Sequence, residues 1–273
     1  MLIKKIKMLI KKIKIICLLA TVFCFCNVDM MAFSGGSGTQ ADPYLISDET
    51  DWVTFRDSVH SSHRWSINKY FELSDDIDLT SLNFVVGPMP ATAFYGNLNG
   101  NGFKLSVSVP LFGRIHTEGV VENLRVDGEI ITDITGIGSS NIGSIARYNY
   151  GLISNCTSYV SIQSGNRVGG IAGENYGVIT KSFNHGNVVA SNGVVGGITG
   201  ISYNTVSYCQ NTGSISSPMG SFGSVNVGGV IGTVSNSSFY SPPDGVITSN
   251  NINIGVVRGE RTVGGIIGGH FLV

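Results

Sequence analysis

A short glycine-rich motif recurs along this chain and constrains its fold more than any other feature. Related hexapeptides begin at five positions: IGSIAR at Ile142, VGGIAG at Val168, VGGITG at Val195, VGGVIG at Val227 and VGGIIG at Val263. Their first glycines lie 26, 27, 32 and 36 residues apart, at Gly143, Gly169, Gly196, Gly228 and Gly264. LFGRI at Leu111 reads as a divergent first copy. A repeat of this period indicates stacked units that bury a continuous core between them.

Each repeat unit contains three short apolar segments. In the unit that begins at Val168 they are VGGIAG, YGVITKS and GNVVAS. All three are rich in β-branched residues and bounded by Gly, Asn or Ser, which is typical of strands joined by turns. Three strands and three turns in about 26 residues predict one coil of an all-β solenoid, stacked on the next coil at about 4.8 Å.

Equivalent positions of the second segment test this stacking. One position holds Ile153, Ile179, Val206 and Ile247, and the position three residues later holds Cys156, Ser182, Cys209 and Asn250. Like residues at one position favour an in-register stack, since each packs on its counterpart one coil away. The two cysteines are then about 9–10 Å apart, whereas a disulfide needs Cα atoms closer than about 7 Å. The sequence therefore predicts two free, buried thiols.

The paired glycines admit two interpretations. A phosphate-binding loop requires G-x-G-x-x-G between a strand and a helix, but Val168 stands at the first glycine position, no helical pattern follows and the motif recurs. In a flat strand Val168 and Ile171 would face opposite sides. A bend or bulge at Gly169 and Gly170 would let both point into the core. The recurrence favours the bend, and we expect neither a nucleotide nor another cofactor.

The N-terminus is typical of a secretory signal peptide. Six lysines precede an apolar run from Ile15 to Val28, which at 14 residues is shorter than the roughly 20 that cross a bilayer. A signal anchor is the alternative. Cleavage after Ala32 or Cys26 fits the small-residue rule incompletely. We predict a signal peptide at 1–32 and a secreted or cell-surface protein.

Removal of residues 1–32 changes the net charge. Lys and Arg fall from 17 to 11 and Asp and Glu from 18 to 17, so the net charge moves from −1 to −6. An acidic surface of this kind excludes nucleic acid and anionic membranes as expected partners.

The exported part divides into a cap and the repeats. Residues 33–95 are predicted to form an N-terminal cap and the start of the solenoid, with a helix at 48–60 capped by Asp48 or Thr50. Trp52, Phe55 and Val59 share one face of that helix, which would cover the open end of the stack. Residues 96–273 are the repeats, and VGGIIGGHFLV starts a coil that we expect to be incomplete. Its apolar edge is a candidate for pairing with a partner strand.

Residues that could carry chemistry are few, and we predict no metal site and no enzyme activity. None of the exported histidines forms H-x-x-x-H or E-x-x-H, although His60 and His63 are spaced i, i+3. Asp75, Asp76 and Asp78 read as turn residues rather than a calcium loop. An acidic column, which a β-helix glycosidase or lyase needs, does not form in the repeats, since Glu174 aligns with Arg147 and Ile201.

A ligand surface is predicted from aromatic residues. Tyrosines follow the glycine motif in three successive units, at Tyr148, Tyr150, Tyr176 and Tyr203, and could stack on sugars or pack on proteins. The competing interpretation is that they cover a corner of the core. The insertions at 216–226 and 235–245 offer further candidates in Phe222, Phe239 and Tyr240, because loops on rigid scaffolds vary and bind.

The VGGIxG…YGxI repeats resemble the GLUG-motif repeats of large bacterial secreted and surface proteins. The preceding GGSGTxxDPYLI, DDIDL and FYGNLNGNGFKL segments are similar to those that lead into such repeats. The resemblance covers about residues 33–273. It implies a right-handed parallel β-helix-like solenoid and an extracellular, adhesin-like role. GLUG repeats also occur in IgA-cleaving metallopeptidases, whose H-E-x-x-H is absent from this sequence.

Three functional hypotheses follow. The first is a non-catalytic binding or spacer module whose partner is a glycan or an extracellular host protein. The second is a carbohydrate-active β-helix enzyme, either a lyase or a glycosidase. The third is a truncated fragment of a larger surface protein. The composition and the repeats favour the first.

Overall fold

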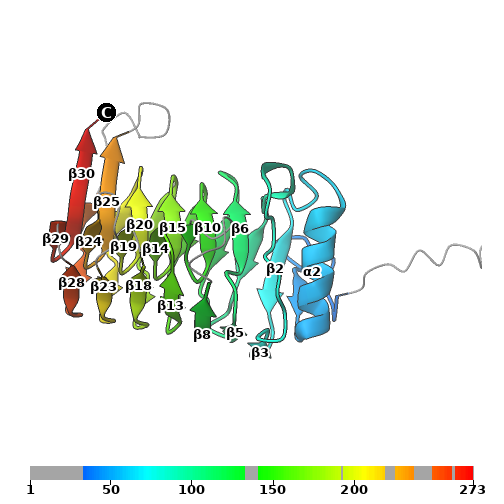
Figure 1. The fold of residues 1–273 in the computed structure, drawn as a ribbon. Coiled ribbons are helices and arrows are strands. Elements are labelled where there is room, and N and C mark those ends of the chain that lie inside the picture. Colours follow the sequence, from blue (N-terminus) through cyan, green and yellow to red (C-terminus); the bar gives the residue numbers. More distant parts are fainter. Residues whose placement is uncertain are drawn as a thin grey trace, which may run out of the picture. The chain divides into compact units, whose positions relative to one another are not determined.

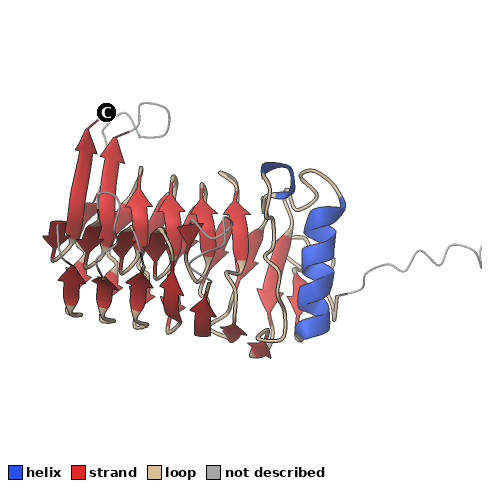
Figure 2. Ribbon diagram, viewed as in Figure 1, coloured by secondary structure: helices blue, strands red, loops and turns tan. Residues whose placement is uncertain are grey.

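A computed structural model describes residues 33–132, 141–191, 193–218, 225–236, 248–259 and 262–272. The predicted signal peptide at 1–32 lies outside the described residues. Residues 33–273 form one compact unit, in which parallel strands of successive coils lie side by side (Figure 1). Apart from one α-helix and one 3-10 turn, the described unit consists of strands and loops (Figure 2). The predicted all-β parallel solenoid with a helical cap is therefore confirmed.

Two sheets run along the stack, one formed by the second apolar segment of each unit and the other by the second half of the glycine motif. The eight-stranded sheet comprises β1 (Tyr44–Ile46), β2 (Tyr70–Leu73), β4 (Asn97–Asn99), β7 (Val120–Glu122), β11 (Leu152–Ser154), β16 (Val178–Thr180), β21 (Val206–Ser207) and β26 (Thr248–Ser249). The six-stranded sheet comprises β6 (Phe112–Ile115), β10 (Ala146–Asn149), β15 (Ala172–Asn175), β20 (Thr199–Ser202), β25 (Ile231–Asn236) and β30 (Ile267–Leu272).

Two further sheets complete each coil. The five-stranded sheet comprises β9 (Asn141–Ile142), β14 (Arg167–Gly169), β19 (Val194–Gly196), β24 (Asn226–Gly228) and β29 (Thr262–Gly264). The eleven-stranded sheet has one arm of β3 (Ile77–Asp78), β5 (Lys104–Val107), β12 (Thr157–Ser158), β17 (Phe183–Asn184), β22 (Gln210–Asn211) and β27 (Ile252–Asn253). Its other arm is β13 (Ser161–Ser164), β18 (Val188–Ala190), β23 (Ile215–Ser217) and β28 (Val257–Gly259), and β8 (Arg125–Ile131) joins the two.

One coil therefore contains five short strands rather than the three predicted segments. In the coil of Val168 these are β14 to β18, because the glycine motif is split between β14 and β15 and a two-residue strand, β17, follows the second segment. The split has the predicted consequence: Val168 and Ile171 are both fully buried. The bend between the two strands thus lets residues three apart face the same core.

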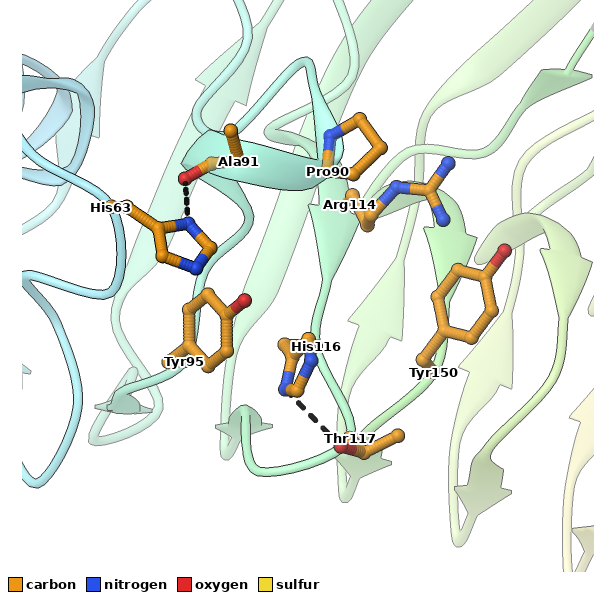
Figure 3. Close-up of a pocket in the computed structure, with 8 residues that line it drawn as sticks. All are labelled: His63, Pro90, Ala91, Tyr95, Arg114, His116, Thr117 and Tyr150. Atoms are coloured by element: carbon orange, nitrogen blue, oxygen red, sulfur yellow. Dashed lines mark hydrogen bonds between the residues drawn. The ribbon is translucent and has the colours of Figure 1, made fainter.

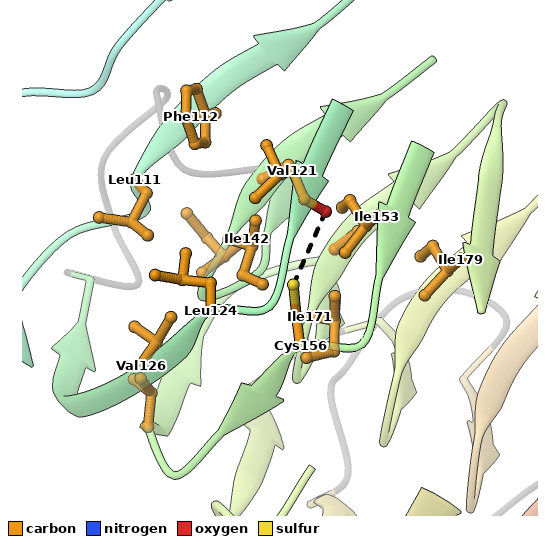
Figure 4. Close-up of a cluster of buried hydrophobic side chains, with 14 of the residues drawn as sticks. Leu111, Phe112, Val121, Leu124, Val126, Ile142, Ile153, Cys156, Ile171 and Ile179 are labelled. Atoms are coloured by element: carbon orange, nitrogen blue, oxygen red, sulfur yellow. Dashed lines mark hydrogen bonds between the residues drawn. The ribbon is translucent and has the colours of Figure 1, made fainter. Parts of the chain in front are cut away.

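Columns of apolar side chains fill the interior of the stack (Figure 4). Ile153, Ile179 and Val206 pair in register through β11, β16 and β21, and all three are fully buried. Burial of a side chain of this size stabilises the fold by about 1.5–3 kcal/mol. Because each coil repeats the contribution, the stack accumulates a continuous core along its axis.

The cysteine column is confirmed. Cys156 and Cys209 are both free and buried. The Cys156 thiol donates to the Val121 carbonyl one coil back at 3.7 Å (Figure 4), and Cys209 repeats this bond to the Ile179 carbonyl at 3.7 Å. Ser182 lies between the two cysteines, and its hydroxyl accepts a bond from the Cys156 amide at 3.3 Å.

A ladder of asparagines explains why the third position of the motif is a second glycine. The side-chain amide of Asn184 donates to Asn211 Oδ1 at 2.8 Å, and the side-chain amide of Asn211 donates to Asn253 Oδ1 at 2.8 Å. A Cβ atom on Gly170 would lie 2.5 Å from Asn184 Cγ, and one on Gly197 would lie 2.4 Å from Asn211 Cγ. The same Cβ atoms would also lie 2.2 and 2.3 Å from the carbonyl oxygens of Gly197 and Gly229 in the next coil. The glycine is thus required by close approach of the ladder and of the neighbouring backbone rather than by an unusual backbone angle.

One coil departs from this rule at both positions together. Ser144 replaces the second glycine, and Ser158, which pairs with Asn184 in register, replaces the asparagine. The Ser144 hydroxyl donates to the Gly170 carbonyl at 2.6 Å. Asn184 Oδ1, at this end of the ladder, is buried and lacks a hydrogen-bond partner among the described residues. A larger side chain at the glycine position is therefore accompanied by a smaller one opposite.

The helix α2 (Glu49–Ser61) caps the stack beside β2 (Figure 1). Its N-cap is Asp48, whose carboxylate accepts from the Asp51 amide at 2.9 Å. Trp52, Phe55 and Val59 are buried, as predicted. Phe55 packs edge-on against rings of the first coils, at centroid distances of 4.7, 5.5 and 6.2 Å from Phe71, Phe94 and Phe112.

The register differs from the prediction in two places. Val206 pairs with Thr248 rather than Ile247, so Asn251 rather than Asn250 follows Cys209 in its column, and its Oδ1 accepts from the Cys209 amide at 2.9 Å. Ile247 and Thr248 are both β-branched, and the insertion before them leaves a one-residue ambiguity that only side-chain facing resolves. Glu174 pairs with Tyr148 rather than Arg147.

Candidate binding surface

Three of the predicted ligand residues form a stack of rings. Asn149, Asn175 and Ser202 pair in register at the ends of β10, β15 and β20, so the tyrosines that follow them project alike from three successive coils. The Tyr150 and Tyr176 ring centroids lie 4.6 Å apart at an interplanar angle of 5°. Tyr176 and Tyr203 lie 4.4 Å apart at 4°. The predicted Phe222, Phe239 and Tyr240 lie outside the described residues.

A buried carboxylate holds the middle of this stack. Glu174 is 1% exposed. Its Oε1 accepts from the Arg167 guanidinium at 2.5 Å, and its Oε2 accepts from the Tyr176 hydroxyl at 2.5 Å. Burial, followed by the bond to Glu174, raises the pKa of Tyr176 well above its usual range, and burial likewise raises the pKa of Tyr203. The Tyr176 hydroxyl is consequently a neutral donor.

The stacking limits what the tyrosines can do. Both faces of the Tyr176 ring are covered, one by Tyr150 and the other by Tyr203. A sugar therefore cannot stack on Tyr176, and only ring edges are presented. Tyr176 thus packs on its neighbours, as the competing interpretation predicts. Ligand binding by these tyrosines stays a prediction.

The aromatic column extends into the cap, which the sequence did not indicate. Phe94 and Ile115 form a parallel bridge, which places Tyr95 and His116 at the same corner as the tyrosines of the later coils. Their rings stack at 3.9 Å and 28°. We call Tyr95, His116, Tyr150, Tyr176 and Tyr203 the aromatic column. The spacing of the repeats does not apply before residue 111, so no sequence signal aligned Tyr95. His116 follows the divergent copy LFGRI, where a histidine stands in place of the tyrosine.

A pocket of about 520 Å³ opens at the cap end of the aromatic column (Figure 3). His63, from the segment after α2, and the 3-10 turn η1 (Pro90–Thr92) form one side. Arg114 of β6 and Tyr150 form the other side, with His116 between them. The His63 Nδ1 atom bonds the Ala91 carbonyl at 2.8 Å. Structure rather than repeat pattern brings these residues together.

The histidine pair spaced i, i+3 does not converge. His60 Nε2 accepts a hydrogen bond from the Gly87 amide at 3.0 Å, whereas His63 turns to Ala91. Burial, reinforced by Arg56, lowers the pKa of His60. A neutral ring that accepts from a backbone amide serves the packing of the cap.

The three aspartates of the cap bond within their own turn or to the next coil. Asp78 Oδ1 accepts from the Thr80 hydroxyl at 2.6 Å and from the Thr80 amide at 2.9 Å, which lowers the pKa of Asp78. Asp76 Oδ1 accepts from the Lys104 amide at 2.8 Å. Within the described ranges, no group of three or more His, Cys, Asp or Glu side chains is placed to hold a metal ion.

A second, more acidic pocket lies on the eight-stranded sheet. Glu72 pairs in register with Asn99, and Asn99 pairs with Glu122, so the two carboxylates stand two strands apart. They line a pocket of about 380 Å³ together with Tyr70 and Asn97. Glu72 lies before the repeats and aligns with Glu122 only through Asn99, so the repeat spacing did not predict this pair.

Two proteins are similar in sequence to part of this chain. No family model matches this chain. A candidate Gly-rich membrane protein of Evansella cellulosilytica is 29% identical over 181 residues, which cover 59% of this chain and 20% of that protein. Halomucin of Haloquadratum walsbyi is 30% identical over 151 residues, which cover 49% of this chain and 2% of halomucin. The chain thus spans a fifth or less of the length of these relatives.

One solved structure is similar over most of the chain. It is the crystal structure of a candidate immunoglobulin A1 protease from Bacteroides ovatus, with a TM-score of 0.55, 18% sequence identity and coverage of 86% of both chains. A likeness at this identity shows the fold alone. Among the described residues, no helix is long and apolar enough to cross a membrane.

Proposed function

We propose that this chain is an exported, non-catalytic β-solenoid of the GLUG-repeat type that acts at the cell surface as an adhesin-like binding or spacer module. The aromatic column carries the proposal, because it sets polar-edged rings at one corner of successive coils of a rigid stack. Side chains repeated at about 4.8 Å suit an extended partner such as a glycan or a protein strand. The names of two relatives, a membrane protein and a halomucin, and the predicted signal peptide support a surface location.

Binding is tested on arrays of glycans and extracellular proteins. We expect retention of a subset of these ligands, and loss of at least tenfold in affinity for Tyr203→Ala. Tyr203 is a better position to substitute than Tyr176, because the Tyr203 ring lies at the end of the stack and contacts one ring. Its substitution leaves the hydrogen bond between Tyr176 and Glu174 intact. Tyr159→Ala is the matched control, since Tyr159 is exposed at another corner, stacked on His185. Equal binding by both variants would contradict the proposal.

The absence of catalysis is tested on the same glycans. We expect no new reducing ends and no unsaturated products after prolonged incubation. Export is tested by expressing the full chain, which we expect to be recovered outside the cytoplasm with its N-terminus at Asn27 or Phe33. Recovery only in the cytoplasm with Met1 or Met8 retained would contradict a surface role.

The acidic pocket supports a second candidate, a carbohydrate-active enzyme. Two inter-strand steps separate Glu72 from Glu122, or about 9–10 Å. That is close to the separation of about 6.5–9.5 Å between the two carboxyl groups of inverting glycosidases. If this second candidate is right, the chain cleaves a polysaccharide, and Glu122→Gln abolishes the cleavage. Cleavage that survives this substitution would remove the pocket as its source.

A further inference from the structure

We infer that the pocket at the cap end of the aromatic column, formed by His63, Tyr95, Arg114, His116 and Tyr150, binds the carboxylate of an acidic saccharide. This inference rests on the proposed function, since it names the ligand class of the same surface. Two observations support it: the basic residues around the pocket, and the lack of an anionic partner for Arg114 among the described residues.

The pocket is a basic site on an acidic chain. None of its lining residues is acidic, and Arg114, His63 and His116 all contribute to its wall. Arg64 adds a further cation beside it, with its guanidinium 5.5 Å from the centre of the Tyr95 ring. The part of the chain after residue 32 nevertheless carries 17 acidic and 11 basic residues. A local reversal of charge of this kind selects an anion.

Arg114 is held in position without an anionic partner. Its guanidinium lies 4.8 Å from the centres of both the Tyr148 and the Tyr150 rings. Among the described residues it forms no ion pair, and its buried Nε atom has no hydrogen-bond partner. A guanidinium without an ion-pair partner can take one from an anionic ligand. The planar guanidinium matches a carboxylate in a bidentate arrangement.

The remaining walls indicate a saccharide rather than a small anion. A volume of about 520 Å³ falls in the range of pockets that enclose organic ligands, about 300–1,000 Å³. Hydroxyls of Tyr95, Tyr150 and Thr117 lie around Arg114 and the two histidines (Figure 3) and can bond sugar hydroxyls. The pocket also continues into the aromatic column, so an extended polymer can lie across both.

His116 makes binding depend on pH. Burial is the main cause that lowers its pKa, and the neighbouring Arg64, His63 and Arg114 lower it further, while Glu118 opposes them. At pH 7 the ring is therefore neutral. A bound carboxylate favours the protonated ring, so affinity rises as the pH falls through the His116 pKa, which lies below 6.5.

The test compares trigalacturonate with neutral galactotriose by isothermal titration calorimetry on the whole exported chain. We expect binding of the acidic trisaccharide only, and tighter binding at pH 5.5 than at pH 7.5. Arg114→Gln should weaken it at least tenfold, whereas Arg125→Gln, at an exposed arginine on another face, should change it less than twofold. Equal loss in both variants, equal binding of the neutral sugar, or acetate and sulfate binding as tightly would each overturn the inference. If the proposed binding function itself is wrong, the arrays retain no ligand of any class. If only this inference is wrong, the arrays retain ligands but the acidic trisaccharide does not bind.

Discussion

Substitution of the second glycine in the repeat motif gives the sharpest test of the stacking. In Gly197→Ala the new Cβ atom would lie 2.3 Å from the Gly229 carbonyl oxygen and 2.4 Å from Asn211 Cγ. Heavy atoms of this kind prefer about 3.5–4.0 Å. The coil must therefore open by more than about 1 Å or the Asn211 side chain must move away.

Neither adjustment is easy, because Asn211 is bonded on both sides. Its amide donates to the Gly213 carbonyl at 2.9 Å and to Asn253 Oδ1 at 2.8 Å, and its own Oδ1 accepts from Asn184 at 2.8 Å. Overpacking costs about 1–3 kcal/mol, and each buried hydrogen bond that is broken adds about 1 kcal/mol. We expect the free energy of unfolding to fall by about 3–5 kcal/mol.

Gly265→Ala is the matched control at the same motif position. A Cβ atom there meets no described atom within 4 Å, so its effect should stay within about 1 kcal/mol. The assay is urea unfolding followed by far-UV circular dichroism. With a slope of about 3 kcal/mol per molar, Gly197→Ala should lower the midpoint by about 1 M or more. Equal midpoints for the two variants would refute the argument from close approach.

Three further predictions concern the interior and the cap. By itself, Ser158→Asn should lower the free energy of unfolding by about 1–3 kcal/mol. Adding Ser144→Gly should restore at least about 1 kcal/mol of this loss, as measured by a double-mutant cycle of urea midpoints. Additive effects of the two substitutions would contradict the coupling. Burial raises the pKa of Cys156 to about 12 and of Cys209 to about 11, so both thiols should resist a thiol reagent at pH 8 until urea unfolds the chain, and fast labelling of the native chain would contradict their burial. The His60 pKa is lowered in the fold, so its contribution to stability is present above pH 6.5 and lost as the pH falls through the folded pKa; His60→Gln should flatten that decline, and an unchanged pH profile would contradict it.

The sequence predicted the features that repeat or that follow local rules. The glycine spacing predicted the stack, the alternation of Cys156, Ser182 and Cys209 predicted the free thiols, and Asp48 was a capping residue by type and position. These features depend on neighbours along the chain or on the same position in the next unit.

The features that were missed depend on contacts between unlike segments. Tyr95 joins the aromatic column only through the bridge between Phe94 and Ile115. Glu72 and Glu122 share a pocket only because Asn99 pairs with both, in a part of the chain that precedes the glycine motifs. The asparagine ladder was missed because it crosses the core of the coil to reach the glycines. Column alignment also failed after the insertion before Thr248, where the spacing alone allowed two registers.

Mapping a bound ligand on the chain tests the central claim most directly. Hydrogen–deuterium exchange is measured with and without the tightest ligand from the arrays, and the ligand is analysed afterwards by mass spectrometry. A binding solenoid predicts protection of backbone amides around residues 114–117, 148–150, 174–176 and 201–203, with the ligand recovered intact. Protection confined to another face of the stack, or a cleaved ligand, would contradict the claim that the aromatic column is a non-catalytic binding surface.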